Sequence, residues 1–397
     1  MPRIQFIFVT SFILFLSCNL GQSQQAKPEK VYRIVYEWKS NEWYQEQAQL
    51  WKQEIERDPT NPDAWYNYYN ANRYAYFEDF ATEEKQRILN KIIEDMGQAI
   101  PETYEYYLLK YWNTYDIHDI TLIKKAYELQ PQRPDSYYPF ITHYEIKGQK
   151  DYLNEFCQKL YDSKDIAPWL LNYNYNVLMS TEGDAILFTN GDNDTYPVWL
   201  LQNTHGIRTD VTVLNISLAA TEEYLKRKLK ALDISLDITE LKRRAKAQET
   251  GEFSKTRFVQ ELAKELLETY PNIPIYFALT VYQDVIKSMR EDLYIVGLAY
   301  QYTDKRIDNL ALIKKNLERN FRLDYLEHDW YQEQYSGNKI KNSMHMNYVI
   351  PMVMLADHYQ MSAEKIKSKE WSELALRLAR DAGNTKSLEE LRKYDYN

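Results

Sequence analysis

The 397-residue sequence contains little glycine, cysteine or histidine. Its 10 glycines form no glycine-rich phosphate loop and no dinucleotide-binding motif, and there is no Gly-x-Ser-x-Gly elbow. The two cysteines and six histidines show no Cys-x-x-Cys or His-Glu-x-x-His spacing, which argues against a zinc site. The net charge of -9 argues against nucleic acid as a partner, because phosphate binding requires clustered Lys and Arg. We therefore expect no catalytic residue, and no cofactor beyond a divalent cation in one interpretation given below.

Long apolar runs are missing as well, except at the N-terminus. The apolar stretch over residues 4–16 is shorter than the roughly 20 residues of a membrane-spanning helix and is typical of a secretory signal peptide. Cys18 follows this stretch and resembles a bacterial lipoprotein cleavage site, which predicts a lipoprotein-type signal peptide over 1–18; cleavage near 21–23 is the alternative. We expect a polar tether over 19–40.

These features predict an exported protein of the cell envelope, facing the periplasm or the outer surface. A lipid on Cys18 would be its one attachment to the membrane. Cys157 is the remaining thiol, and its apolar helical context predicts a buried small side chain rather than a nucleophile.

Residues 41–180 have a helical pattern that is interrupted by regularly spaced prolines. The prolines are separated by 39, 33 and 34 residues, and they are Pro62, Pro101, Pro134 and Pro168. Proline suits the first turn of a helix, and paired helices with a period near 34 are typical of tetratricopeptide-like repeats. Because one helical hairpin cannot bury its apolar face alone, we expect the hairpins to stack.

A change of rhythm at Gly183 predicts an α/β unit over residues 181–305. Short apolar runs typical of buried strands occur over 185–189, 211–215, 273–280 and 293–296. The first two runs, with a short helix between them, predict a right-handed βαβ unit. Helical patterns return over 306–397. The expected fold is mostly α with an α/β unit, in which tetratricopeptide-like helical hairpins flank a small Rossmann-like parallel sheet.

The polar run from Asn190 to Thr195 lies where the first predicted strand ends and a helix begins. Ligands of α/β sheets bind at the carboxyl ends of strands, and a helix N-terminus presents free N–H groups. The candidate ligand-binding residues are Asn190, Asp192, Asn193, Asp194 and Thr195, with Tyr276 and Asp284 from the end of the third strand. Asp192 and Asp194 are also candidate ligands of a divalent metal. The same residue types favour helix caps and Asx turns, so a purely structural turn is the alternative.

Three segments carry a resemblance to a known family: Gly191 to Gln202, Gly206 to Val211, and Val213 to Leu218. Together they resemble the soluble extramembrane C-terminal region of a bacterial family of multi-pass membrane proteins related to protein O-mannosyltransferases. The Gly-Asp-Asn-Asp-Thr run is its most specific part, and the resemblance covers about 181–305. The family's catalytic carboxylate belongs to its membrane-helix bundle, so no residue here inherits that role. The resemblance implies a stand-alone extramembrane domain rather than a complete transferase.

Two functions fit these observations. The first is a non-catalytic interaction or scaffold module of the envelope, with an envelope protein or a glycan as its partner. The second is an accessory role in protein O-glycosylation, in which the α/β crevice binds a sugar phosphate or a metal, or supports a glycosyltransferase-related activity. The lack of a complete catalytic constellation favours the first.

Overall fold

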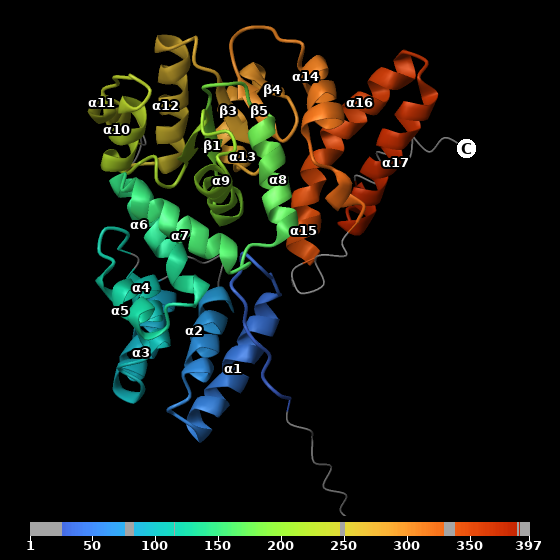
Figure 1. Cartoon of the computed structure of the whole chain (residues 1–397). Coiled ribbons are helices and arrows are strands. Elements are labelled where there is room, and N and C mark those ends of the chain that lie inside the picture. Colours follow the sequence, from blue (N-terminus) through green and yellow to red (C-terminus); the bar gives the residue numbers. More distant parts are fainter. Residues whose placement is uncertain are drawn as a thin grey trace, which may run out of the picture.

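The computed structural model describes residues 26–75, 83–114, 116–246, 251–328, 338–386 and 389. The expected signal peptide and Cys18 lie outside the described residues. The described chain is mostly helical and contains a five-stranded sheet, which confirms the expected class of a mostly α fold with an α/β unit. In Figure 1, helices α1 to α5 lie in the lower part of the molecule, below the sheet.

The first half of the described chain consists of helices that pack as neighbours in the sequence. They are α1 (Asn41–Arg57), α2 (Pro62–Ala75), α3 (Glu83–Ala99), α4 (Tyr104–Thr114), α5 (Thr121–Leu129), α6 (Tyr137–Lys147) and α7 (Lys150–Asp162). The pairs α1–α2, α4–α5 and α6–α7 are in contact. Pro62 begins α2, Pro134 begins a single turn ahead of α6, and Pro168 begins α8 (Pro168–Met179), because proline has no N–H to leave unpaired there. The assignment of these hairpins to the tetratricopeptide-like class stays a prediction.

The segment 26–40 packs against the helices, so the expected tether over 19–40 is wrong for this part. Val31 is fully buried, and its backbone N–H donates to Asn67 Oδ1 in α2 at 2.7 Å. The indole N–H of Trp51 in α1 donates to a backbone carbonyl of the segment at 2.8 Å. The polar composition did not predict this, because single apolar residues find their partners on distant helices.

The sheet has the strand order β2-β1-β3-β5-β4. The strands are β1 (Ile186–Thr189), β2 (Thr212–Asn215), β3 (Ile275–Ala278), β4 (Leu293–Ile295) and β5 (Ala299–Tyr302). Strands β2, β1 and β3 are parallel, whereas β5 runs antiparallel to both β3 and β4. The expected parallel pairing is thus correct among β2, β1 and β3 and wrong for the two pairings that β5 makes. The turn of 296–298 between β4 and β5 is too short for a parallel crossover, which needs about a dozen residues.

The βαβ unit is formed by β1, α9 (Asp192–His205) and β2, as expected. All residues of β1 and β3 are buried, which is typical of strands covered on both faces. The rings of Phe188 and Phe277 stack across these strands, with their centroids 4.7 Å apart. This apolar centre holds the carboxyl ends of β1 and β2 in a fixed position relative to the helices.

Further helices lie on both sides of the strands in Figure 1. On the left are α10 (Glu222–Lys230), α11 (Ile238–Arg244) and α12 (Lys255–Thr269); on the right are α8, α14 (Asn309–Lys315), α15 (Asn338–His345), α16 (Val349–Met361) and α17 (Lys365–Asp381). One hydrophobic core extends from Ile55 in α1 to Ala379 in α17, and it includes Cys157, which is buried as expected. The helical half and the α/β unit are therefore packed as one body.

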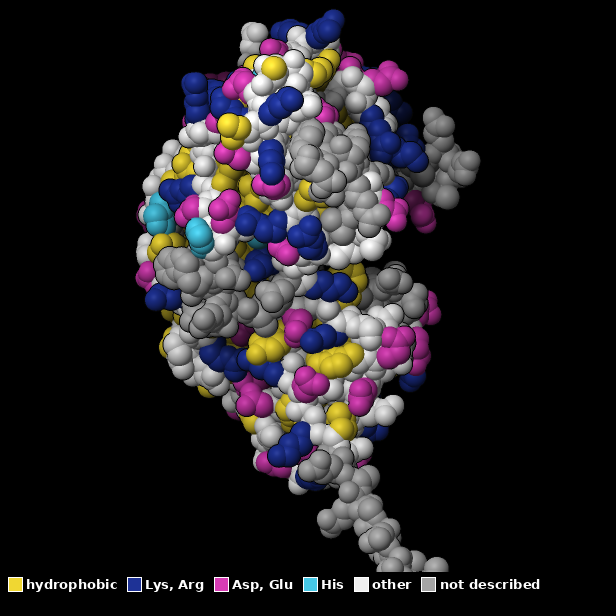
Figure 2. All heavy atoms as spheres, turned by 90° about the vertical axis from the view of Figure 1, so that its right-hand side faces the viewer, with side chains coloured by type: hydrophobic (Ala, Val, Ile, Leu, Met, Phe, Trp, Pro, Cys, Tyr) yellow, Lys and Arg dark blue, Asp and Glu magenta, His cyan; other side chains and the backbone are white. Residues whose placement is uncertain are grey.

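The surface in Figure 2 carries interspersed acidic and basic side chains where they are drawn in colour. A surface with mixed charges does not produce a strong electrostatic potential of one sign. Among the described residues, no helix combines the length and the apolar character that crossing a membrane requires.

Candidate functional site

Asp194 holds together the elbow between β1 and α9. Its carboxylate accepts the backbone N–H groups of Asn190 and Gly191, both at 2.7 Å, and the hydroxyl of Thr280. The residue is 2% exposed. Burial raises the pKa of Asp194, although these hydrogen bonds act in the opposite direction. Asp194 therefore has the structural role of a helix cap, and Thr280 after β3 closes the elbow from a second strand.

A buried network of polar side chains fixes the neighbouring strand ends. The hydroxyls of Thr189 and Thr195 are 2.8 Å apart, and Asn215 Nδ2 donates to Thr195 Oγ1 at 2.9 Å. Asn215 also donates to the backbone carbonyl of Asn190 at 3.2 Å. These contacts use the polar atoms of Thr195 within the protein, so the structure supports the structural interpretation for Thr195 and for the backbone of Asn190.

Asp192 and Asn193 have partners on the N-terminal segment instead. Asp192 Oδ2 lies 3.3 Å from Arg33 Nη2, and Asn193 Nδ2 donates to the carbonyl of Val35 at 3.2 Å. Asp192 has a side chain that is 44% exposed. The two carboxylates of the run thus have different partners, which does not match the shared coordination that the metal hypothesis requires. Among the described residues there is no group of three or more His, Cys, Asp or Glu side chains placed to hold a metal ion.

Tyr276 and Asp284 do not join this site, which corrects the expectation that they line the same crevice. The hydroxyl of Tyr276 accepts the backbone N–H of Glu182 at 3.4 Å, which places it at the opposite end of β1. Asp284 is exposed in the short helix α13 (Gln283–Ile286), outside the cavity described next. Thr280 occupies the position at the strand end that sequence reasoning gave to these two residues.

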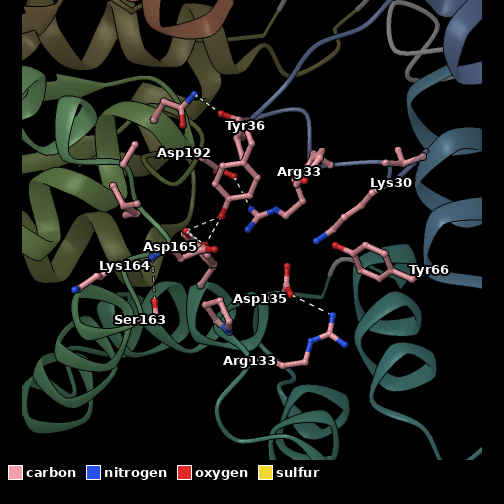
Figure 3. Close-up of a pocket in the computed structure, with 18 of the residues that line it drawn as sticks. Lys30, Arg33, Tyr36, Tyr66, Arg133, Asp135, Ser163, Lys164, Asp165 and Asp192 are labelled. Carbon is pink, nitrogen blue, oxygen red and sulfur yellow. Dashed lines mark hydrogen bonds and ion pairs between the residues drawn. The ribbon is translucent and has the colours of Figure 1, made fainter. Parts of the chain in front are cut away.

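Asp192 and Asn193 line a cavity of about 770 Å³, here called the Arg33 pocket. Its walls are the segment 28–36, the start of α2, the link before α6, the link 163–167 before α8, and the start of α9. Figure 3 shows these chain segments meeting around Arg33. Segments that are far apart in the sequence therefore combine with the elbow into one site.

Arg33 lies at the centre of this pocket among aromatic rings. Its guanidinium carbon is 4.5 Å from the ring centroid of Tyr138 and 5.6 Å from that of Tyr36. Burial by itself would lower the pKa of Arg33, but the nearby tyrosines, Asp192 and Asp135 raise it above its usual range. Arg33 is therefore a permanent positive charge that joins the N-terminal segment to the start of α9.

Asp135 lies in the link before α6 and Asp165 in the link before α8, and both line the pocket. Asp165 accepts hydrogen bonds from the hydroxyls of Tyr138, at 2.7 Å, and Tyr36. Asp135 lies 3.6 Å from Arg133, which also pairs with Glu105. Burial raises the pKa of Asp135, and the negative charge of Asp165 adds to this effect.

Sequence reasoning missed Arg33, Asp135, Asp165 and Thr280. One signal was present: an acidic residue directly follows three of the regularly spaced prolines, in Pro62-Asp63, Pro101-Glu102 and Pro134-Asp135. Two of these acids, Asp63 and Asp135, line the pocket. For Arg33 the pattern of the sequence contained no comparable signal.

Arg208 and Asp210 form a local ion pair before β2. Arg208 Nη2 lies 2.8 Å from Asp210 Oδ2. Arg208 also donates to the carbonyls of Leu178, Thr181 and Glu182 at 2.6 to 3.0 Å. The pair thus attaches the end of α8 to the start of β2, away from the Arg33 pocket.

Comparison with known proteins finds a similarity for the part of the chain that contains the elbow. Residues 170–256 match the family model "TMEM260-associated domain 2", and the match includes α8, β1, α9, β2, α10 and α11. The comparison with curated proteins gives no match. TMEM260 is linked to protein O-glycosylation, so this match agrees with the resemblance to the O-mannosyltransferase-related family. The matched part of this chain, well under half of its length, is thus similar to a domain that accompanies a protein of O-glycosylation.

Proposed function

We propose that this chain is an exported binding module of the cell envelope that acts in protein O-glycosylation by holding a glycan in the Arg33 pocket. The observation that carries the proposal is the pocket itself. Its volume of about 770 Å³ falls within the roughly 300–1,000 Å³ of typical ligand sites. Asp192 and Asn193, from the segment similar to TMEM260-associated domain 2, form part of its wall.

The chemistry of the lining supports a glycan. Aromatic side chains such as Tyr32, Trp51 and Tyr66 line the pocket together with carboxylates and basic groups. An aromatic face packs against the C–H face of a sugar ring, while charged side chains exchange hydrogen bonds with its hydroxyls. A purely apolar or a single-sign lining would instead suit a lipid or a polyanion.

The contacts within the lining support binding rather than catalysis. Arg33 pairs with Asp192, and Asp165 accepts hydrogen bonds from two tyrosines. These groups hold one another in place, which gives the pocket a fixed shape before a ligand arrives. A preorganised site of this kind lowers the entropy that binding costs.

The proposal also places the pocket near a membrane. The lining begins at Pro28, ten residues after Cys18. Even a fully extended chain of that length spans no more than about 35 Å. A lipid on Cys18 would therefore keep the Arg33 pocket close to the membrane surface, where a lipid-linked or newly modified glycan would be found.

Calorimetric titration of the full-length protein in detergent tests this function. The ligands are a peptide carrying one O-linked mannose and the same peptide without the sugar. We expect the glycopeptide to bind and the bare peptide to bind far more weakly. Tyr32→Ala, at the rim of the pocket, should weaken binding several-fold. Tyr282→Ala should not, because Tyr282 is also an exposed tyrosine but lies outside the pocket.

One outcome would contradict glycan binding, and another would contradict its location in the Arg33 pocket. Equal binding of both peptides would favour the protein-scaffold function over a glycan-binding one. Binding that is unchanged by Tyr32→Ala, with the glycopeptide preferred, would place the glycan site elsewhere on the molecule.

A further inference from the structure

The lining of the Arg33 pocket carries cationic and carboxylate side chains in equal number. The cations are Lys30, Arg33, Arg133 and Lys164, and the carboxylates are Asp63, Asp135, Asp165 and Asp192. The charged side chains of the lining therefore sum to no net charge. An anionic ligand would meet the carboxylates, and a cationic ligand would meet the basic groups, in a partly desolvated site where both contacts are costly. The lining therefore favours a ligand without net charge.

Asp135 differs from the other carboxylates of the pocket in its partners. Asp192 and Asp165 have partners at hydrogen-bond distance, whereas the charged partner of Asp135 among the described residues is Arg133 at 3.6 Å. The Asp135 side chain is 18% exposed, and Figure 3 shows it in the space between Arg33 and Arg133. It thus retains capacity to accept hydrogen bonds from a ligand.

The opposite wall supplies donors. In Figure 3, Lys30 and Tyr66 reach from the N-terminal segment and from α2 toward the space that Asp135 faces. An ammonium group and a phenol can both donate to a hydroxyl oxygen, and a carboxylate can accept from two hydroxyls. Two adjacent hydroxyls on one sugar ring can donate hydrogen bonds to a carboxylate and accept hydrogen bonds from an ammonium or a phenol.

We propose that the Arg33 pocket takes a neutral saccharide, with two adjacent ring hydroxyls that donate to Asp135 while Lys30 donates to the ring's oxygens. This inference rests on the proposed glycan-binding function and narrows it to a ligand class. A sugar phosphate or a uronic acid is disfavoured, because its anionic group would lie against Asp135 and Asp165. Asp135 is the residue that determines this specificity.

The test measures binding of small saccharides to the full-length protein by ligand-observed NMR titration. The neutral probes are the methyl glycosides of mannose, glucose, galactose and fucose; the anionic probes are mannose 6-phosphate and glucuronic acid. We expect at least one neutral glycoside to bind, and to bind at least about tenfold more tightly than the anionic probes.

Variants on the two walls separate recognition from folding. Asp135→Asn keeps the size of the side chain but replaces one acceptor by a donor, and should weaken binding of the neutral glycoside by about tenfold or more. Its thermal midpoint should not fall, because burial already disfavours the charge of Asp135. Lys30→Gln on the exposed segment should weaken binding a few-fold. Asp304→Asn, on an exposed loop outside the pocket, is the matched control and should bind as the unchanged protein does.

The outcomes distinguish this inference from the function on which it rests. Tighter binding of mannose 6-phosphate or glucuronic acid would overturn the neutral class and leave glycan binding in place. Unchanged binding by Asp135→Asn would overturn the role of Asp135. If none of the saccharides binds, and the mannosylated peptide does not bind either, both proposals fail.

Discussion

Replacing each aspartate of the elbow in turn separates a structural turn from a ligand site. Asp194→Ala removes a carboxylate that accepts two backbone N–H groups and one hydroxyl. Each buried donor left without a partner costs about 1–3 kcal/mol. The charge of Asp194 is itself costly to bury, which offsets part of this loss. We therefore expect the free energy of unfolding to fall by about 3 kcal/mol.

Asp192→Ala is the matched control, two residues away in the same turn. It removes the ion pair with Arg33. The side chain of Asp192 is 44% exposed in this pair. The Asp192 end of this pair is exposed, the Arg33 end is 12% exposed, and Arg33 keeps its contacts with Tyr36 and Tyr138, so the unfolding free energy should fall by only about 1 kcal/mol. Asp194→Asn should behave more like Asp194→Ala than like the unchanged protein, because its amide nitrogen faces N–H donors.

The assay is urea denaturation followed by circular dichroism, with the slope of each transition compared between variants. Hydrogen exchange gives a local measure, since the amides of Asn190 and Gly191 should lose protection in Asp194→Ala alone. Equal destabilisation by the two alanine substitutions would refute the assignment of Asp194 to the cap and Asp192 to the pocket.

Two further predictions concern residues away from the Arg33 pocket. Arg208→Ala removes the ion pair with Asp210 and three hydrogen bonds to carbonyls, and should lower the unfolding free energy by about 2–4 kcal/mol. Urea denaturation measures this loss. A loss below about 0.5 kcal/mol would contradict the role of Arg208 in attaching the end of α8 to the start of β2. Burial lowers the pKa of His345 to about 3 from the usual 6.5. As the pH falls below 6.5, the unfolded state binds a proton at His345 that the folded state does not bind, so the free energy of unfolding decreases until the pH reaches about 3. At pH 4.5 the loss from this group is about 2.7 kcal/mol, two pH units at 1.36 kcal/mol each. His345→Phe should flatten the pH dependence of the urea midpoint between pH 4.5 and 7, and an unchanged dependence would count against the buried neutral histidine.

Local chemistry was enough to predict the elements of this fold. Pro62 and Pro168 begin helices because a missing N–H is harmless in a first turn. The run from Asn190 to Thr195 forms a strand-to-helix turn because its side chains cap nearby backbone groups. Short apolar runs likewise predicted β1 and β2, since burial of neighbouring residues is visible in sequence order.

The arrangement of the site depended on contacts between distant segments. Whether Asp192 or Asp194 faces a cavity follows from where Thr280 and Arg33 lie, and no local pattern contains that information. The antiparallel pairing of β5 depends on the edge of β3 that was left open.

The sequence by itself therefore determined the helices, the parallel core of the sheet and the capped elbow, because each rests on residues close together in the chain. Only the tertiary structure decided that the segment 26–40 packs as a wall and that Asp135 and Asp165 meet Arg33. The contacts of Asp135 and Asp165 with this segment join residues about 100 or more positions apart, whereas its contacts with α1 and α2 join residues closer in the sequence. Their free energy arises from packing that exists only once the helices have stacked.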